Sequence, residues 1–292
     1  MKKDIKVFAA DIDGTLAGKG EDLLPLTKKA LEDLHAEGVL IGPASGRPLD
    51  KNTIEKSKAW GLNFDFDFAI GLNGGDLWTK DDNKIHRINY LKPETIKKIL
   101  EMIWDLDINA IIYRDAYADI LAKRIDEFLL DSQRRNNSKI AEGTIEELSA
   151  KETGKIEVHL KHKDLDELMR RIKENESSDW AWIKTFEVTP ETALFLPEEM
   201  RKEFGDHVTI EFQDPAINKV LALKKYLDMK NIEVEKSIAF GDMQNDTEMI
   251  RVAGIGVCML NGCDESKEAA DFITEHACAD DGVGHFLYDH IL

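Results

Sequence analysis

Residues 7–16 read VFAADIDGTL, an apolar segment that runs directly into two carboxylates two positions apart and then into Gly-Thr. An apolar run of this kind predicts a strand buried on both faces, as in a parallel sheet. Asp11 and Asp13 follow at its carboxyl end, and side chains two positions apart leave an extended chain on the same face. Gly14 permits a turn there, and Thr15 can cap it with a hydrogen bond. Because open α/β sheets bind ligands at the carboxyl ends of their strands, this stretch also predicts a ligand site.

Strands and helices alternate on both sides of a long middle segment. On the N-terminal side, apolar periodicity predicts strands at 5–10, 39–44 and 66–72 and helices at 26–35 and 51–60. On the C-terminal side it predicts helices at 219–229, 245–252 and 267–270 and strands at 237–240, 256–259 and 271–274. This order favours an α/β fold with a doubly wound, Rossmann-like parallel sheet and right-handed crossovers.

The middle segment has a different pattern of polar and apolar residues. We expect a hairpin around 80–84, helices at 93–106 and 124–134, a solvated charged helix face at 161–174, and strands with polar alternation at 108–113, 155–160 and 208–212. Polar alternation is typical of a sheet that is open on one face. The sequence therefore predicts a core formed by residues 1–82 and 213–292 and an inserted α+β domain at 83–212.

The composition limits the possible partners. The chain has 292 residues with 39 Lys and Arg against 57 Asp and Glu, which gives a net charge of −18. A field of that sign repels nucleic-acid phosphates and anionic lipid headgroups, so we expect neither nucleic acid nor a membrane as partner. An anionic small substrate would need a local positive centre, supplied by a metal ion or by a few aimed basic side chains.

The cysteines and the N-terminus indicate a cytoplasmic location. Three cysteines without a CxxC spacing suggest neither a disulfide framework nor a zinc site. Met1-Lys2-Lys3-Asp4 leads directly into the first predicted strand, without a signal-type apolar segment, and no run of about 18 or more apolar residues follows. We therefore expect a soluble, unsecreted protein with reduced thiols. The sequence carries no signal for an oligomeric state.

Three further polar clusters stand where loops meet at the same sheet edge. They are Ala44-Ser45-Gly46-Arg47 after the second strand, Asn218-Lys219 at the start of a helix, and Gly241-Asp242-Met243-Gln244-Asn245-Asp246 after the strand at 237–240. Asn73-Gly74-Gly75, after the third strand, predicts a turn first and a place at the mouth of the site second. His159 and His162 are expected at the surface rather than as a metal pair.

The residue types in these clusters suit phosphate chemistry. Mg²⁺ favours a few carboxylate oxygens together with water and substrate phosphate, which fits Asp11 and Asp242. Ser45 and Gly46 at a helix N-terminus would suit phosphate oxygens, and Lys219 would add a point charge. Of two neighbouring carboxylates, one can attack phosphorus to form an aspartyl phosphate. The other can protonate the leaving oxygen and then take a proton from water.

The clusters together resemble a known family. Asp11-Ile12-Asp13-Gly14-Thr15, Ser45-Gly46-Arg47, Lys219 and the segment 241–246 look like the four ordered motifs of the haloacid dehalogenase-like hydrolases. The nearest branch is that of the Cof-type phosphatases with a C2B cap, whose C-terminal signature resembles Met259-Leu260-Asn261-Gly262, Glu265-Ser266-Lys267, Ala270-Asp271 and Asp281-Gly282-Val283. Departures at Met243, Cys258 and Gly262 concern packing rather than chemistry.

The resemblance implies a role for each motif residue. Asp11 would be the nucleophile and a Mg²⁺ ligand. Asp13 would be the general acid and base, and its backbone carbonyl would also bind the metal. Asp242 would be the third protein ligand of the metal, supported by Asn245 and Asp246.

The same resemblance implies a phosphate- and substrate-binding set. Its members would be Thr15, Ser45, Gly46, Arg47, Asn218 and Lys219. The implied reaction is Mg²⁺-dependent hydrolysis of a small phosphorylated metabolite, with sugar phosphates as the expected class, under an inserted cap. The alternatives are a sugar phosphomutase that uses the same two aspartates and a non-catalytic sensor of phosphoryl ligands.

Overall fold

The computed structural model describes residues 4–189, 193–194, 198, 201 and 205–292. The chain divides into two compact units, of which the first is Met1–Ile88 with Ile217–Leu292 and the second is Asn89–Ala216. The hairpin of β4 (Asp76–Thr79) and β5 (Lys84–Arg87) therefore groups with the first unit. Among the described residues, every helix is too short or too polar to span a lipid bilayer.

The first unit is built on a five-stranded parallel sheet in the order β14-β13-β12-β1-β2. Its strands are β1 (Val7–Ala10), β2 (Leu40–Pro43), β12 (Ser237–Gly241), β13 (Ile255–Cys258) and β14 (Phe272–Ile273). β1 lies between β2 and β12, and all four of its side chains are buried. The expected doubly wound α/β sheet is confirmed.

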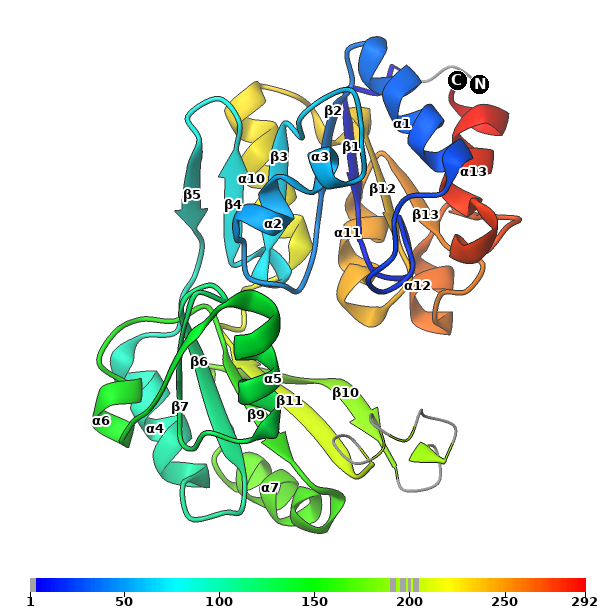
Figure 1. Cartoon of the computed structure of the whole chain (residues 1–292). Coiled ribbons are helices and arrows are strands. Elements are labelled where there is room, and N and C mark those ends of the chain that lie inside the picture. The colour runs from blue at the N-terminus through cyan, green and yellow to red at the C-terminus, as the bar shows by residue number, and fades with distance from the viewer. Residues whose placement is uncertain (1–3, 190–192, 195–197, 199–200, 202–204) are drawn as a thin grey trace. The chain divides into compact units, whose positions relative to one another are not determined.

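Helices cover both faces of this sheet, as Figure 1 shows. Phe8 and Phe240 pack with α1 (Pro25–Ala36) and α13 (Gly282–His290) on one face. Val7, Ala9 and Ala239 pack on the other face with α10 (Lys219–Lys230) and α11 (Thr247–Val252). Because neighbouring β1 residues point to opposite faces, an unbroken apolar run is what a doubly covered strand requires.

A second, antiparallel sheet extends the unit beyond β2. It contains β3 (Phe68–Gly71), β4 and β5, and a parallel bridge between Ala44 and Ile70 joins it to the chain after β2. The 3-10 turn η1 (Leu72–Gly74) follows β3 directly. The remaining short elements of the unit are α2 (Lys51–Ile54), α3 (Lys56–Ala59), η2 (Val234–Lys236), η3 (Gln244–Asp246), α12 (Asp264–Ala269) and η4 (Cys278–Asp280).

The helix predicted at 51–60 is two short helices, α2 and α3, that are separated at Glu55. The Asp50 side chain accepts a hydrogen bond from the Thr53 amide at 2.7 Å and so caps α2. Pro48 also disfavours helical backbone at Arg47. The helix thus begins well after Ser45 and Gly46.

The second unit contains a six-stranded mixed sheet in the order β10-β11-β9-β6-β7-β8. All neighbouring pairs are antiparallel except β7 with β8. The strands are β6 (Asn109–Asp115), β7 (Asp119–Ala122), β8 (Lys139–Glu142), β9 (Ile156–Leu160), β10 (Ala181–Val188) and β11 (His207–Gln213). The helices that the structure describes in full there are α4 (Pro93–Ile103), α5 (Glu127–Asn136), α6 (Ile145–Leu148) and α7 (His162–Glu174). The predicted α+β insertion is confirmed in its secondary structure.

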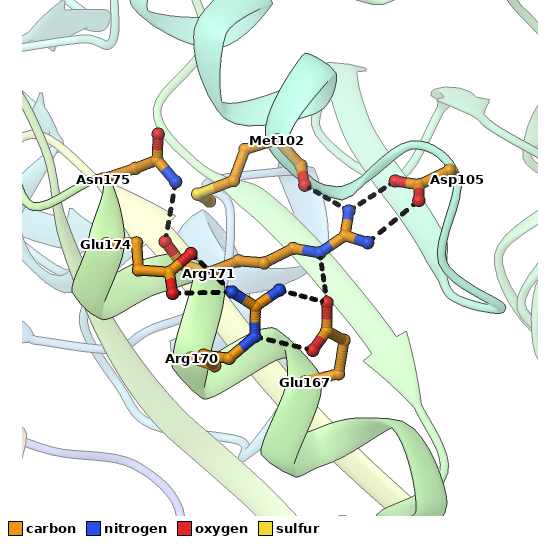
Figure 2. A network of polar contacts seen from close by, with 7 residues as sticks. All are labelled: Met102, Asp105, Glu167, Arg170, Arg171, Glu174 and Asn175. Atoms are coloured by element: carbon orange, nitrogen blue, oxygen red, sulfur yellow. Dashed lines mark hydrogen bonds and ion pairs between the residues drawn. The ribbon is translucent and has the colours of Figure 1, made fainter.

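The charged run at 161–174 forms the exposed face of α7, as expected. Leu168 and Ile172 point into the apolar cluster beneath the helix. Figure 2 shows Arg170 paired with Glu167 and Glu174, while Arg171 contacts Glu167, Asp105 and the Met102 carbonyl. Arg171 thereby ties α7 to the end of α4.

His159 is not at the surface as predicted, because it is 5% exposed on β9. Its Nε2 lies 2.8 Å from the buried Glu157 carboxylate. That partner allows a polar ring to be buried in the sheet, which hydrophobic periodicity alone does not reveal.

Candidate active site

A buried lysine is the centre of the site at the carboxyl edge of the parallel sheet. Lys219 is the first residue of α10 and is 0% exposed. Its Nζ lies 2.5 Å from Asp11 Oδ1 and 2.6 Å from Asp246 Oδ1. The preceding Asn218 caps the helix by accepting a hydrogen bond from the Leu221 amide at 2.8 Å. The end of β1, the start of α10 and the loop after β12 therefore meet at one ammonium group.

Three carboxylates converge beside this lysine. One oxygen each from Asp11, Asp242 and Asp246 lies within 4.8 Å of the others. Asp246 Oδ2 accepts the amides of Asp242 and Met243, at 3.0 and 3.1 Å, so backbone donors and Lys219 fix this side chain. Thr15 donates its hydroxyl proton to Asp242 Oδ1 at 2.8 Å.

Burial raises the free energy of the charged carboxylates. It raises the pKa of Asp11 to about 7, although the neighbouring Lys219 opposes that shift. Burial likewise raises the pKa of Asp242 to about 6, against the Thr15 hydrogen bond. For Lys219, burial alone would lower the pKa, but the charges of Asp11 and Asp246 outweigh it and raise the pKa.

This donor set fits a hard divalent cation. Three buried carboxylates face one ammonium group, which leaves negative charge that a cation would neutralise. Asp11 and Asp242 each use only one oxygen in the hydrogen bonds found among the described residues. Oxygen donors without cysteine or histidine suit Mg²⁺ rather than zinc.

Asp13 lies outside the carboxylate cluster. Its side chain is 30% exposed, and Arg47 Nη2 approaches its two oxygens at 2.7 and 2.6 Å. Arg47 was expected at the phosphate or substrate. The structure places its guanidinium on the predicted general acid instead.

A glycine is required at position 14 because the loop after β1 approaches the loop after β12 closely there. Its φ is +92°, and a Cβ added there would lie 2.6 Å from Asp242 Oδ2. A side chain at this position would push the Asp242 carboxylate away from Asp11. Asn261, in the C-terminal signature, donates to the Gly14 carbonyl at 2.9 Å and holds the turn from outside.

Ser45 and Gly46 do not stand at a helix N-terminus, so that part of the prediction is wrong. They lie in a loop, where Ser45 Oγ accepts the Arg47 amide at 3.2 Å. The helix begins only at Lys51, because Asp50 supplies the cap and Pro48 interrupts the chain between them. Any anion held here would meet loop amides and a hydroxyl rather than a helix end.

Asn73 belongs to the Asn73-Gly74-Gly75 segment, which the sequence predicts primarily as a turn and only secondarily as part of the site. It is 5% exposed, and its Oδ1 accepts a hydrogen bond from Asn245 Nδ2 at 3.0 Å. Asn245 is thereby linked to the chain after β3 rather than to Asp242. The only available sequence signal was an Asn-Gly pair at the end of a buried strand.

A doubly wound α/β core with buried aspartates and a buried lysine at the carboxyl edge defines a class of hydrolase. A sequence model described as haloacid dehalogenase-like hydrolase matches residues 8–287. The chain belongs to the haloacid dehalogenase-like hydrolases, in the Cof-type subclass, and is a phosphatase that acts on phosphoric monoesters.

Individual relatives match over nearly their full length. The Bacillus subtilis protein named 5-amino-6-(5-phospho-D-ribitylamino)uracil phosphatase YitU is 24% identical over 286 residues, covering 97% of each chain. The crystal structure of TM0651 from Thermotoga maritima has a TM-score of 0.78 at 24% identity and covers 99% and 98% of the two chains. The subclass IIB sugar phosphatase BT4131 has a TM-score of 0.72 at 21% identity and covers 97% and 98%. The two structures support the fold.

Proposed function

We propose that this phosphatase is Mg²⁺-dependent and acts on small phosphorylated metabolites in the cytoplasm, with sugar phosphates as its substrate class. The observation that carries the proposal is the placement of Lys219 Nζ between Asp11 and Asp246, with Asp242 alongside. A cation and a lysine together provide the positive centre that an anionic substrate needs in a protein of net charge −18. The names of the relatives support the substrate class, since one is a sugar phosphatase and another acts on a phosphoribityl compound.

We assign the metal to Asp11, Asp242 and the Asp13 backbone carbonyl. Asp246 supports these ligands by accepting the Asp242 amide, and Asn245 supports them indirectly, through the loop that it shares with Asp242. When bound, Mg²⁺ would neutralise charge on the phosphoryl oxygens and the carboxylates. Lys219 would stabilise the same charge from the other side, and its contact with Asp11 orients that carboxylate. Ser45 and Gly46 would bind the transferred phosphoryl group.

In the proposed first step, a carboxylate oxygen of Asp11 attacks phosphorus. An acyl-phosphate bond forms as the P–O bond to the leaving group breaks, and Asp13 gives its proton to the departing oxygen. In the second step, Asp13 takes a proton from water, and the hydroxide attacks phosphorus. The Asp11 carboxylate and inorganic phosphate are released.

Arg47 and Thr15 have positioning roles in this scheme. Arg47 contacts both oxygens of the partly exposed Asp13 carboxylate and would fix its direction toward a leaving group. Thr15 fixes Asp242 through its hydroxyl. Asn218 acts through the helix cap that places Lys219. We further propose that the inserted domain, predicted at 83–212 and found as the unit Asn89–Ala216, acts as a cap that selects the leaving group, and that the rest of the chain, predicted as 1–82 and 213–292, is the catalytic core.

The test is a panel of phosphorylated metabolites, assayed for released phosphate with Mg²⁺ and again with EDTA. Sugar phosphates should be hydrolysed fastest, and EDTA should stop the reaction until Mg²⁺ is restored. A hexose 1-phosphate in the panel also separates hydrolysis from mutase activity, because a mutase would return hexose 6-phosphate without releasing phosphate. Turnover that persists in EDTA would contradict the metal assignment.

A further inference from the structure

The turn that ends β3 has a backbone conformation unusual for its residues. Leu72, Asn73 and Gly74 have φ values of +49°, +54° and +106°. A positive φ is uncommon outside glycine and costs free energy at a leucine. Residues held in such conformations cluster at functional sites, where surrounding contacts stabilise them. The contacts of this turn lead to three loops of the active site.

The turn is hydrogen-bonded along its backbone to the loop at 45–47. The Leu72 amide donates to the Arg47 carbonyl at 2.9 Å, and the Asn73 amide donates to the Ser45 carbonyl at 3.1 Å. In the other direction, the Ser45 amide donates to the Ile70 carbonyl at 2.8 Å. The backbone of the proposed phosphate-binding loop is therefore fixed by the turn.

The Asn73 side chain joins that loop to the loop after β12. Its Oδ1 accepts the Asn245 amide group at 3.0 Å, and a Cβ added to Gly46 would lie 3.0 Å from the same oxygen. Gly46 therefore leaves the room that the buried Asn73 amide occupies. Asn245 is three residues after Asp242 and adjoins Asp246, so this bond acts on the loop that carries both carboxylates.

Gly74 brings the turn against the start of α10. A Cβ added there would lie 2.0 Å from the Asn218 carbonyl oxygen and 3.0 Å from the Lys219 nitrogen. No side chain fits between these backbones. The segment that places Lys219 is thus packed directly on the turn.

We propose that Asn73 is a positioning residue for phosphoryl transfer, because the Asn73-Gly74 turn fixes the loop at 45–47 against the Asn245 loop and the start of α10. The inference rests on the proposed function of this site. The groups that must surround one phosphoryl group come from segments far apart in the sequence, so their spacing depends on cross-links of this kind. A displacement of about 1 Å at such a site can cost up to about 100-fold in rate.

The test is Asn73→Gly, with Asn83→Gly as the matched control. Glycine keeps the left-handed backbone and the amide bond to Ser45 and removes only the side-chain amide. Asn83 also has a positive φ, of +53°, and accepts one side-chain hydrogen bond, from Trp78 Nε1 at 3.1 Å, in the β4–β5 hairpin. With p-nitrophenyl phosphate and Mg²⁺, kcat of Asn73→Gly should fall on the order of 10- to 100-fold, and that of the control should not.

Two further measurements separate positioning from a loss of folding. Inorganic phosphate should inhibit Asn73→Gly more weakly than wild type, whereas both glycine variants should lose similar melting temperature. Asn245→Ala should slow the reaction too, and the double variant should be no slower than the slower single variant. Equal kcat and equal phosphate inhibition in Asn73→Gly and Asn83→Gly would overturn the inference.

Failure of the proposed function would give a different pattern. In that case the wild type would hydrolyse phosphomonoesters as fast in EDTA as with Mg²⁺, or would not favour sugar phosphates, and kcat and phosphate inhibition of Asn73→Gly would still be compared with those of Asn83→Gly. An increase in melting temperature on adding phosphate with Mg²⁺ that is lost only in Asn73→Gly would keep the positioning role. A wild type that neither hydrolyses phosphomonoesters nor binds phosphate would reject both.

Discussion

Among the residues that the structure describes, each unit buries one lysine between two carboxylates, and the two sites differ in what surrounds them. In the first unit, Lys219 contacts Asp11 and Asp246 at 2.5 and 2.6 Å. In the second, Lys155 contacts Glu211 and Glu157 at 2.6 and 3.0 Å. Both lysines are at most 6% exposed, and both have a raised pKa, because neighbouring carboxylates outweigh burial.

In the second unit, the negative charges of Glu157 and Glu211 are balanced by neighbouring side chains on or beside the strands of the sheet. Glu157 and Glu211 are direct partners on β9 and β11, a pairing of like charges that is unfavourable unless a cation bridges them. Lys155 provides that bridge, and Tyr113 and His159 add hydrogen bonds to Glu157 at 3.1 and 2.8 Å. Burial raises the pKa of Glu157, but Lys155 outweighs it, so the pKa is lowered.

The site in the first unit keeps an uncompensated charge. Its carboxylates stand on loops after strands, where a third one, Asp242, joins the pair around Lys219. Burial raises the pKa of Asp11 there, as it raises that of Glu211 in the second unit, so the third carboxylate and not the direction of the pKa shift distinguishes the two sites. A buried ion network on regular strand positions is thus explained by the sheet, whereas one on converging loops with excess charge indicates a site for an ion and a substrate.

Replacing one carboxylate beside each lysine with the corresponding amide should produce the largest difference in activity between the two sites. We expect Asp11→Asn to lower kcat by roughly 10³-fold or more, because an amide oxygen cannot replace the proposed nucleophile. Glu211→Gln makes the same chemical change beside Lys155, and phosphatase assays should find its activity close to wild type. Comparable activity in the two variants would remove the distinction between the sites.

Removing each lysine should destabilise its own unit. We expect Lys219→Met and Lys155→Met each to lose about 3–5 kcal/mol of unfolding free energy, because buried carboxylates are left unpaired. Mg²⁺ should restore part of that loss only in Lys219→Met, where the carboxylates can take a cation. Thermal unfolding in EDTA and in Mg²⁺ measures both effects. The same response to Mg²⁺ in the two variants would argue against a metal site in the first unit.

Metal removal from the wild type should have a smaller effect on stability. A ligand that binds only the folded state adds about 2.7 kcal/mol at a concentration 100 times its Kd. The melting temperature should therefore rise as Mg²⁺ is added to EDTA-treated protein, and Asp242→Asn should weaken the increase. Glu211→Gln serves as the control, since its carboxylate lies in the other unit. A Mg²⁺ response that Asp242→Asn leaves unchanged would exclude Asp242 as a ligand.

The sequence predicts the parallel core and the convergence of Asp11, Lys219 and Asp242, because these depend on local signals. Apolar runs locate the strands, and the polar residues that follow them must then gather at one edge. Asp13 shows the limit of that reasoning, since its contact with Arg47 depends on how two loops are folded.

What the sequence could not predict depends on contacts between distant segments. α1 has no side-chain cap of its own from Leu24, and Asp281 instead accepts the Thr27 amide at 2.8 Å. The sequence pattern identifies Asn73 as a turn residue. Asn73 links two loops only because the fold places Asn245 next to it, where the Asn73 side chain accepts a hydrogen bond. His159 is polar and buried because Glu157 lies two residues away on the same face. Hydrophobic periodicity indicates whether a residue tends to be buried or exposed, but it does not identify the distant hydrogen-bond partner that allows a polar residue to be buried.

The smallest predicted effect is a pH dependence that belongs to the second unit. Burial and, to a smaller extent, the neighbouring His159 lower the pKa of His207 from 6.5 to about 4. The His207 Nε2 lies 2.9 Å from Thr209 Oγ1. Between these two pKa values the unfolded chain binds more protons than the folded one. Stability from this group is therefore present above pH 6.5 and is lost as the pH falls towards 4.

His207→Gln removes the titrating ring and should flatten that part of the stability curve. The measurement is urea unfolding in EDTA at a series of pH values from 7 down to 4. The exposed His290 supplies the control, and His290→Gln should keep the wild-type slope. If both variants lose stability with acid as steeply as wild type, the slope comes from carboxylates rather than from the histidine beside the Lys155 network. The acid response would then no longer distinguish the second unit from the first.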